Sequence, residues 1–341
     1  MPNSSICILP QLNTTGGPSS FQSKLKAGLA ARGIETHHNI SRENTRTLLI
    51  TGATRDLGAL LEAKRRGISV VQRLDGMNWL HKRRATGLHQ YLRSERMNLQ
   101  LAVIRRWFTN AIVYQSEFTR DWWNCVYGKI NKPSAVIYNG VNLATFNPSG
   151  GVSISNDFIR IMVVEGSFKG GHERDLRNAV EFANQLSEYL GKKVELAIAG
   201  NVPEDLSKQI SDSGLALVNW LGIVPHERIP DFDRSAHLFF PAEINAACPN
   251  SVVEALACGL PVVGYATGSI PELVGEDGGM VVPYGSDYWK LEAPATEVLA
   301  KAATGVLKQL PQYRISARKR AEIYFSLDQM VEAYLEILLA N

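Results

Sequence analysis

The residue best placed to do chemistry is Glu254, which lies in a short predicted helix at 251–258. A polar loop at 242–250 precedes this helix, and apolar runs at 237–240 and 261–266 flank the two, which predicts a strand–loop–helix–strand unit. In open α/β sheets, ligands bind at the carboxyl ends of the strands. The start of a helix also presents unpaired N–H groups and the positive end of its dipole. The pattern therefore predicts a phosphate-binding site where this helix begins.

Glu254 itself has two interpretations. Ser251 and Glu254 have the spacing of a capping box, in which the carboxylate folds back onto the start of its own helix. In the other interpretation the carboxylate faces a ligand and accepts two hydrogen bonds from a ribose diol. Spacing alone favours the cap, because capping boxes are common at helix starts.

The segment 249–274, PNSVVEALACGLPVVGYATGSIPELV, resembles the signature of the retaining glycosyltransferases of family 4, which have the GT-B fold. In that family a loop and a helix N-terminus hold the diphosphate of a nucleotide-sugar donor. The resemblance implies that Asn250, Ser251 and Val252 hold the diphosphate and that Glu254 holds the nucleotide ribose. It therefore favours the second interpretation of Glu254.

One departure from the family pattern concerns the donor sugar. The family has an acidic residue eight positions before the helix glutamate, where this chain has Ala246. Glu243 and Asn245 lie close enough in the loop to replace it, and the sequence does not decide between them. The usual sugar contact, and with it the identity of the sugar, is therefore open.

A second departure follows the apolar run that begins the C-terminal half. Gly166, Ser167 and Lys169 stand where the family has a Gly-Arg…Lys-Gly pattern, whose cations neutralise the leaving diphosphate. Lys169 keeps one cation, whereas Ser167 replaces the arginine. A solvated loop charge is the plain alternative for Lys169. Arg174 or Arg177 could supply the second cation, and the sequence does not decide between them.

Two loops of the N-terminal half are further candidates. Gly16 and Gly17 follow the first predicted strand at 5–10, a position typical of a flexible turn, and the resemblance implies contact with the donor diphosphate and the acceptor. Asp75 follows the predicted strand at 69–72. It either caps the helix that follows or faces the cleft and orients an acceptor hydroxyl, and the two interpretations are equally supported.

Other loop residues complete the set of candidates. Gly200 and Gly222 end two predicted strands of the C-terminal half, and the resemblance implies that the nucleobase lies at the second. Asp231 and Asp233 form a DFD triplet like the metal-binding triplet of a different glycosyltransferase fold. Because they lie in a predicted helix, we expect surface charge there and no metal. No cofactor is expected besides the donor substrate.

Length and pattern bound the architecture. A chain of 341 residues suits two domains, and alternating predicted strands and helices indicate doubly wound parallel sheets. With the resemblance, the expected fold class is α/β, GT-B, with two Rossmann-like domains facing a cleft. The expected divisions are 1–148 on the acceptor side, 158–325 for nucleotide-sugar binding, and a helix at 326–341 that crosses back to the first domain. The apolar stripe of this last helix comprises Met330, Val331, Tyr334, Leu335 and Leu338.

Composition excludes several classes of protein. The hydrophobic content of 45% and charged content of 20% are typical of a globular protein, and no run approaches the roughly 20 apolar residues of a membrane span. The N-terminus has no signal-peptide pattern. The four cysteines form no CxxC pair, and Cys7 and Cys258 are expected to be buried thiols, which predicts a reducing, cytoplasmic location. The net charge of +3 gives no argument for nucleic acid.

Positive charge and aromatic residues gather in the segment 79–108. Its basic residues are Lys82, Arg83, Arg84, Arg93, Arg96, Arg105 and Arg106, and its aromatic residues include Trp79, Tyr91, Trp107 and Phe108. A solvated helical face is the usual meaning of such charge. The alternative is contact with an anionic membrane surface or a phosphorylated lipid acceptor, on the inner face of a membrane.

The sequence therefore predicts transfer of a sugar from a nucleotide-diphosphate sugar to a hydroxyl of a glycan or lipid-linked acceptor, with retention of the anomeric configuration. No residue stands out as a covalent nucleophile, so the leaving phosphate is expected to take the acceptor proton on the same face. Lys169 and the amides of 250–252 would stabilise the charge. The competing class is a non-catalytic GT-B protein that binds a sugar nucleotide or a partner enzyme. The donor base, the acceptor and the oligomeric state are not encoded in any recognised pattern.

Overall fold

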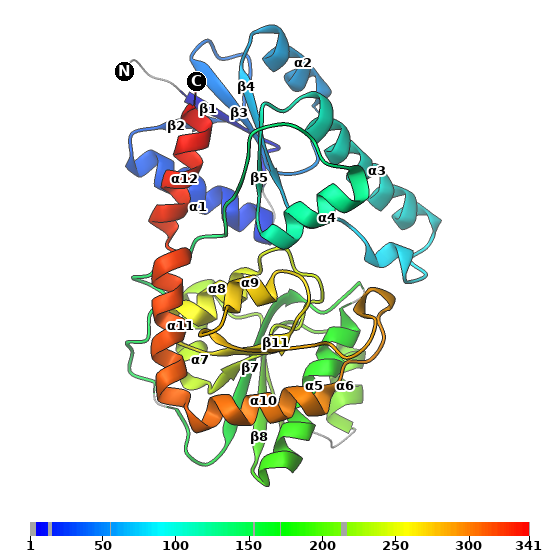
Figure 1. The fold of residues 1–341 in the computed structure, drawn as a ribbon, viewed down its shortest axis with the longest axis vertical. Helices are drawn as coiled ribbons and strands as arrows, with labels where there is room; N and C mark the ends of the chain where they lie inside the picture. The colour runs from blue at the N-terminus through cyan, green and yellow to red at the C-terminus, as the bar shows by residue number, and fades with distance from the viewer. Residues whose placement is uncertain are drawn as a thin grey trace. The chain divides into compact units, whose positions relative to one another are not determined.

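The structure is a computed structural model that describes residues 5–12, 16–54, 56–152, 154–170, 172–212 and 217–340. It divides the chain into two compact units. The first unit comprises Met1–Gly140 and Leu327–Asn341, and the second comprises Val141–Ser326. Each unit is an α/β structure around one six-stranded sheet (Figure 1).

The sheet of the first unit is entirely parallel and has the strand order β2-β1-β3-β4-β5-β6. Its strands are β1 (Ser5–Leu9), β2 (Glu35–His37), β3 (Thr45–Ile50), β4 (Ser69–Leu74), β5 (Ala111–Tyr114) and β6 (Ser134–Val136). Its helices are α1 (Gly17–Ala31), α2 (Leu57–Arg65), η1 (Leu80–Lys82), α3 (Leu88–Trp107), α4 (Glu117–Tyr127) and α12 (Leu327–Leu339). The central strands are buried along almost their whole length, as expected for a parallel sheet covered on both faces.

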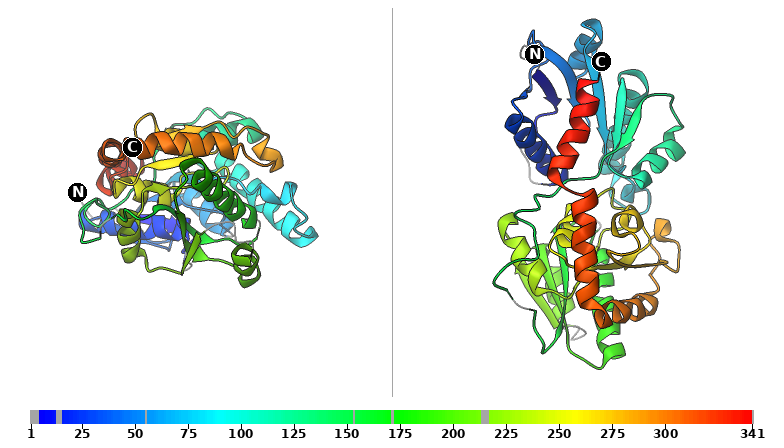
Figure 2. Two further views of the ribbon diagram at one scale, coloured as in Figure 1. Left: turned by 90° about the horizontal axis from the view of Figure 1, so that it is seen from below. Right: turned by 60° about the vertical axis from the view of Figure 1, so that its left-hand side comes forward.

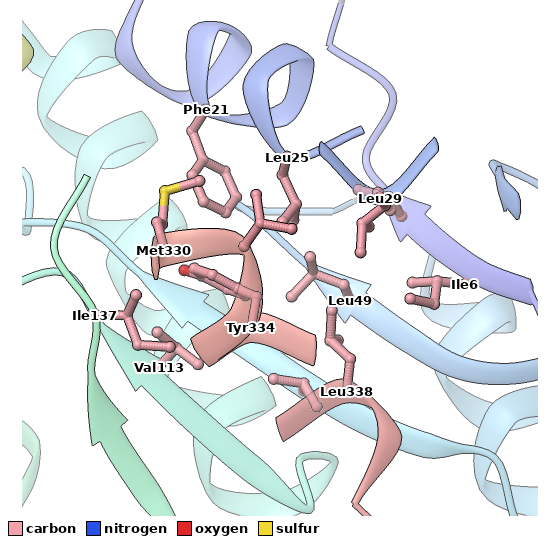
Figure 3. Close-up of a cluster of buried hydrophobic side chains, with 13 residues drawn as sticks. Ile6, Phe21, Leu25, Leu29, Leu49, Val113, Ile137, Met330, Tyr334 and Leu338 are labelled. Atoms are coloured by element: carbon pink, nitrogen blue, oxygen red, sulfur yellow. The ribbon is translucent and has the colours of Figure 1, made fainter. Parts of the chain in front are cut away.

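The last helix, α12, packs within the first unit although the second unit precedes it in sequence. It lies against α1, β3 and β4 (Figures 1 and 2). Met330, Val331, Tyr334 and Leu338 of its predicted stripe are buried in one cluster with α1 and the sheet, and Figure 3 shows Tyr334 beside Phe21 and Leu49. A Cβ atom on Gly28 would overlap Val331 Cγ2, so a glycine is needed where α1 and α12 meet. The expected return of the C-terminal helix to the first domain is confirmed.

The sheet of the second unit is also parallel, with the order β12-β11-β10-β7-β8-β9. Its strands are β7 (Ile159–Ser167), β8 (Val194–Asn201), β9 (Leu217–Gly222), β10 (Leu238–Phe239), β11 (Val262–Tyr265) and β12 (Gly279–Val282). Its helices are α5 (Glu173–Leu190), α6 (Glu204–Asp212), η2 (His226–Arg228), α7 (Ile229–Ser235), α8 (Asn250–Ala257), α9 (Ile270–Val274), η3 (Tyr288–Lys290), α10 (Thr296–Lys308) and α11 (Leu310–Tyr324). The doubly wound pattern predicted from the sequence is present in both units.

Two smaller expectations concern the cysteines and the membrane. Cys7 and Cys258 are buried free thiols, as predicted. No helix among the described residues has the length and apolar character needed to cross a membrane.

Candidate active site

The topology of the second sheet indicates where along its strand ends a ligand would bind. The chain runs from β7 to β8 and β9 on one side and then returns to β10, β11 and β12 on the other, so its direction changes between β7 and β10. In open α/β sheets, ligands bind outside the carboxyl ends of the strands at this switch point. The candidate site is therefore built from the residues that follow β7 and β10.

A pocket of about 80 Å³ lies at this switch point. Its lining residues are Glu165, Ser167, Phe168, His172, Asp175 and Glu243. They come from the end of β7, the start of α5 and the loop after β10. Pockets that hold a complete small-molecule ligand are usually about 300–1,000 Å³, so this one has room for only part of such a ligand.

His172 and Asp175 form an ion pair in the pocket. His172 precedes the first turn of α5, and its Nδ1 atom lies 2.9 Å from Asp175 Oδ2. The hydrogen bond to Asp175 raises the pKa of His172 to about 9, so the imidazole is charged at neutral pH. Because Nδ1 is engaged, Nε2 is the ring nitrogen that can contact a ligand.

Glu165 and Glu243 are the other carboxyl groups of the pocket. Burial, and then the nearby charge of Glu243, raise the pKa of Glu165 to about 8. Burial also raises the pKa of Glu243, and the His172 charge opposes that rise. Two carboxyl groups in one desolvated place resist ionising together. At neutral pH the pocket therefore contains a protonated Glu165 and a charged imidazole beside the Glu243 carboxyl group.

The loop after β10 shows what stands in place of the family's acidic residue. Ala246 is 2% exposed, and its carbonyl oxygen accepts a hydrogen bond of 3.0 Å from the Ser269 amide. Asn245 is buried in a left-handed conformation with φ of 61°. Of the two candidates for a replacement, Glu243 lines the pocket, whereas Asn245 is not among the residues that line it.

The capping-box interpretation of Glu254 is wrong. Helix α8 begins at Asn250 with Pro249 as its N-cap residue, and no side chain caps it. Ser251 is therefore already inside the helix, too late in the chain to serve as the N-cap of a box. Pro249, with an extended backbone, is the N-cap residue, so the helix begins one residue before the predicted start.

Glu254 is instead held by a histidine that no sequence pattern singles out. The Glu254 side chain is 4% exposed, and its Oε1 atom lies 2.8 Å from Nε2 of His226 in η2. The His226 side chain is 56% exposed and packs near the Phe146 ring, with centroids 5.1 Å apart. The carboxylate thus points toward the loop that follows β9.

The cations near the β7 end differ in their surroundings. Lys169 is exposed, and its backbone N–H donates to Ser167 Oγ at 3.2 Å. Arg174 donates through Nη2 to the Glu292 carbonyl oxygen, and Arg177 donates to Gln209 Oε1 at 2.8 Å. Both arginines are thus engaged by other segments, and His172 is a cationic group that lines the pocket with Ser167.

The predicted glycines have different local roles. Gly200 has φ of 149°, and a Cβ atom there would overlap the Glu165 carbonyl oxygen, so this glycine lets β8 approach the end of β7. Gly222, at the end of β9, has a left-handed backbone conformation. A Cβ atom built on Gly166 would have no described atom within 4 Å. In the first unit, Gly16 is the N-cap residue of α1, and Gly17 is its first residue.

The prediction that the DFD triplet is surface charge is wrong for Asp233. Asp231 is partly exposed and pairs with Arg228 and Arg234 at 2.9 and 2.6 Å. Asp233 is fully buried, and burial raises its pKa well above the usual value. The reason is that α7 packs its inner face against α8. Within the described part of the chain, no cluster of three or more His, Cys, Asp or Glu residues suits a metal ion.

Asp75 lies in a closed hydrogen-bonded ring in the first unit. Arg73 donates to Asp75 and, at 3.0 Å, to Asn139 Oδ1, while Gln115 donates to the same Asp75 oxygen. Asn139 completes the ring by donating to Gln115 Oε1 at 3.4 Å. Asp75 does not cap the next helix, because η1 has Trp79 at its N-cap position without a side-chain cap. Burial raises the pKa of Asp75, and Arg73 and Gln115 act against that rise.

Four residues of the site have no counterpart among the sequence predictions, namely Glu165, His172, Asp175 and His226. A histidine and an aspartate three residues apart at a helix start were a usable signal for His172 and Asp175. Glu165 lies in an apolar strand, and His226 meets Glu254 from 28 residues away in sequence, so neither contact has a local signature.

Comparisons with known proteins concern most of the second unit and the fold of the whole chain. Residues 168–314 match the family model of the glycosyl transferases group 1. Over 145 residues, 42% of this chain, the protein is 27% identical to one subunit of the phosphatidylinositol N-acetylglucosaminyltransferase of Arabidopsis thaliana. The aligned part is 31% of that relative, and the chain spans less than a third of the length of the curated relatives it matches.

Solved structures are similar over the whole chain. One is Anabaena Alr3699/HepE in complex with UDP and glucose, with a TM-score of 0.70, 13% identity and coverage of 99% of this chain and 100% of the other. Another is the sucrose-phosphate synthase of Thermosynechococcus elongatus, with a TM-score of 0.72, 14% identity and the same coverage. These neighbours and the two parallel sheets identify the fold of the chain as GT-B.

Proposed function

We propose that the protein is a retaining glycosyltransferase of family 4 that moves a sugar from a nucleotide-diphosphate sugar to a hydroxyl of a glycan or lipid-linked acceptor. The observation that carries the proposal is the arrangement at the switch point of the second sheet. There the buried Glu254, the start of α8 and the polar pocket lie at strand ends inside the segment that matches the group 1 glycosyl transferases or directly beside it.

Each part of a nucleotide-sugar donor has a matching group in this proposal. Glu254 accepts hydrogen bonds from the ribose, with His226 moving aside or holding the second carboxylate oxygen. The backbone amides of 250–252 and the Lys169 ammonium hold the diphosphate, because a helix start and a cation both favour anions. Glu243 takes the sugar contact that Ala246 cannot make, and Gly222 allows the nucleobase to approach the end of β9.

The proposed reaction needs no covalent intermediate. The bond from the anomeric carbon to the phosphate oxygen breaks, the acceptor oxygen bonds to the same face of that carbon, and the acceptor proton passes to the leaving phosphate. The protein contributes charge stabilisation and positioning rather than a nucleophile. The proposal assigns no step to a metal or another cofactor.

A thermal-shift panel tests the donor part of the proposal. The purified protein would be mixed with UDP-glucose, UDP-N-acetylglucosamine, GDP-mannose and the free nucleoside diphosphates. A ligand present at 100 times its Kd stabilises the folded state by about 2.7 kcal/mol, which is readily seen as a rise in Tm. No shift with any nucleotide sugar would contradict the proposal.

The competing proposal is a non-catalytic protein that binds a sugar nucleotide or a partner enzyme. Ala246 and Ser167, which replace charged residues of the family pattern, favour it. The two proposals separate in an assay with the nucleotide sugar that gives the largest shift. Slow hydrolysis of that donor, or transfer to a glycan extract, indicates an enzyme, whereas binding without any release of nucleoside diphosphate indicates a binding protein.

We also propose that helix α3 docks on anionic membrane from the cytoplasmic side. The helix buries the polar residues Ser94, Asn98 and Arg105 together with Ala102 and Ile104, while it exposes a row of large apolar residues, namely Leu88, Leu92, Leu99, Val103 and Trp107, by 40–75%. Arg93, Arg96 and Arg106 are exposed on the same helix. An exposed apolar face with positive charge suits the interface of an anionic bilayer.

The structure also corrects the set of surface cations in this segment. Arg105 is 1% exposed and donates to the Tyr114 hydroxyl at 3.0 Å and to Asn124 Oδ1 at 2.6 Å, so it belongs to the core. The one acidic residue in the sequence of α3, Glu95, lies 2.6 Å from His81 Nε2 and 3.1 Å from Lys82 Nζ. The exposed charge of the helix is therefore positive.

Vesicle sedimentation tests the docking proposal. Binding should increase with the fraction of anionic lipid and decrease with salt, because each basic residue near such a surface contributes about 1 kcal/mol. Leu92→Ser with Trp107→Ser should weaken binding, whereas Leu217→Ser, at an exposed leucine of the second unit, should not. Equal binding to neutral and anionic vesicles would contradict the proposal.

A further inference from the structure

The pocket at the switch point contains a set of groups that the assignments above leave unused. Glu165, His172, Asp175 and Phe168 line it together with Glu243. The set mixes a cationic N–H donor, carboxyl groups of differing pKa and a buried aromatic ring. A pocket of about 80 Å³ accommodates part of a sugar ring and not a nucleotide.

This mixture matches the hydrogen-bonding needs of sugar hydroxyls. Each hydroxyl donates one hydrogen bond and accepts up to two, so a hydroxyl pair needs both acceptors and donors around it. The Glu243 carboxyl oxygens accept, whereas a protonated Glu165 and the imidazolium of His172 donate. Phe168 lines the pocket but is 0% exposed, so it closes the pocket on the protein side and the polar groups remain for the ligand.

We propose that Glu165, Glu243 and the His172–Asp175 pair form a subsite that binds two free hydroxyls of the transferred sugar. Asp175 acts as a positioning residue, since its Oδ2 atom lies 2.9 Å from His172 Nδ1 and directs Nε2 to the ligand. The proposal rests on the proposed function, because it assumes that a nucleotide sugar binds at the carboxyl ends of β7 and β10. It adds a substrate class, a sugar that keeps adjacent hydroxyls free.

The pKa values support this arrangement of donors and acceptors. The raised pKa of about 8 keeps Glu165 neutral at pH 7, and the pKa of about 9 keeps His172 charged. The titratable groups that face Glu165 are Glu243, His172 and Asp175, and these are the groups whose charges act on its pKa. The protonated Glu165 is lost as the pH rises through 8, so the contribution of the sugar to affinity should decrease there.

The test compares two probes, the best nucleotide sugar of the thermal-shift panel and its free nucleoside diphosphate, by titration calorimetry at pH 7. Loss of a hydrogen bond to a charged group weakens binding about tenfold or more. Glu243→Gln and His172→Gln should therefore each weaken nucleotide-sugar binding about tenfold and leave nucleoside diphosphate binding unchanged. Glu188→Gln, an exposed carboxylate of the same helix α5, is the matched control.

Glu165→Gln provides a second readout that does not depend on a loss of affinity. The glutamine amide has nearly the shape of the protonated Glu165 carboxyl group and, like it, both donates and accepts hydrogen bonds. The variant should therefore bind the nucleotide sugar as the wild type does at pH 6.5. Unlike the wild type, it should keep that affinity at pH 8.5. Each variant's Tm shows whether it is folded.

The outcomes separate the two proposals. If no nucleotide or nucleotide sugar binds the wild type, the proposed function fails and the subsite fails with it. If the wild type binds both probes and the variants at 243 and 172 change neither affinity, or change both equally, the donor site stands and the subsite is rejected. Tighter binding of an amino sugar nucleotide than of its hydroxyl counterpart would also reject it, because it would indicate an ammonium site.

Discussion

The polar residues around Asp75 in the first unit and those around Glu165 in the second unit differ in how the protein supplies their hydrogen-bond partners. Arg73, Asp75, Gln115 and Asn139 hydrogen-bond to one another in a closed ring, and the Arg73 guanidinium carbon lies 3.8 Å from the centre of the Phe21 ring. In the second unit His172 and Asp175 pair with each other, and burial together with the nearby Glu243 charge raises the pKa of Glu165 to about 8. Burial also raises the pKa of Asp75, but there the donors Arg73 and Gln115 oppose the rise.

The contrast indicates different roles. The ring engages the Asp75 carboxylate by two donors of the protein itself and so rigidifies this end of the sheet, although the buried Nε atom of Arg73 has no hydrogen-bond partner among the described residues. A set of charged and desolvated groups that line a pocket costs stability and is characteristic of a place that a ligand completes. We therefore expect substitutions in the ring to change stability and substitutions near the pocket to change binding or turnover.

The largest effect expected near the pocket is on turnover. Lys169→Ala should lower kcat by about a hundredfold or more, because negative charge grows on the leaving diphosphate as the anomeric bond lengthens. The donor KM should change much less. Both constants would be measured with the true donor. Arg174→Ala is the control, since Arg174 donates to the Glu292 carbonyl oxygen. Normal turnover in the Lys169 variant with collapse in the Arg174 variant would show that the diphosphate is misplaced.

Glu254→Gln tests the ribose assignment. A hydrogen bond to a charged group contributes about 1.5–3 kcal/mol, so donor Kd should rise about tenfold to a hundredfold. Stability should change little, because Glu254 does not cap α8. Paired calorimetric titration and thermal melting measure the two quantities. His226→Ala is informative beside it: if the histidine only holds the carboxylate, that variant weakens donor binding less. Unchanged donor affinity in Glu254→Gln would end the assignment.

The sequence predicted the fold and suggested a site at strand ends of the second unit, and it failed where a contact has no local signal. The βαβ alternation and the stripe of α12 are periodic patterns, so the residue order alone was enough to derive both. The helix start at Asn250 was missed by one residue, and this slip was enough to make a capping box plausible for Glu254. The burial of Asp233 depends on the packing of α7 against α8, which a charged triplet does not reveal.

The pocket also shows that local sequence patterns do not reveal contacts between distant segments. Glu243 was selected because it is close in sequence to the position that lacks an acid. Glu165 was passed over because a single carboxylate at the end of an apolar strand has no pattern. The two meet because β7 and β10 are neighbours in the sheet although they lie far apart in the chain. Strand order, which single-sequence patterns do not specify, is therefore what creates the pocket.

A stability measurement on Asp75 tests the other half of the contrast. Asp75→Ala leaves the Arg73 guanidinium, which is 1% exposed, without its carboxylate, and we expect the free energy of unfolding to fall by about 2 kcal/mol. Breaking a fully buried pair costs roughly 3–5 kcal/mol, and the loss here is smaller because the Asp75 side chain is 31% exposed. Denaturant unfolding measures this loss. Asp121→Ala, at a carboxylate that is 74% exposed on α4, is the control and should cost little. A folded variant of unchanged stability that loses turnover would instead support an acceptor-orienting role for Asp75.

The smallest expected effect is a pH-dependent difference in stability at Glu165. Its pKa rises from 4.5 to about 8 on folding, so between these values the folded state binds a proton that the unfolded state has released. The wild type should therefore lose stability as the pH rises from about 5 to 8, and His172, with a pKa raised to about 9, adds a loss of the same sign above pH 6.5. Glu165→Gln removes the first contribution, so its stability relative to the wild type should increase by at most about 1.4 kcal/mol per pH unit across this range and stay constant above pH 8. Urea unfolding at half-unit pH intervals measures the difference, with Glu188→Gln as the variant whose difference stays flat. A flat difference for Glu165→Gln as well would mean that the Glu165 carboxyl group ionises normally and that the pocket is no less satisfied than the Asp75 ring.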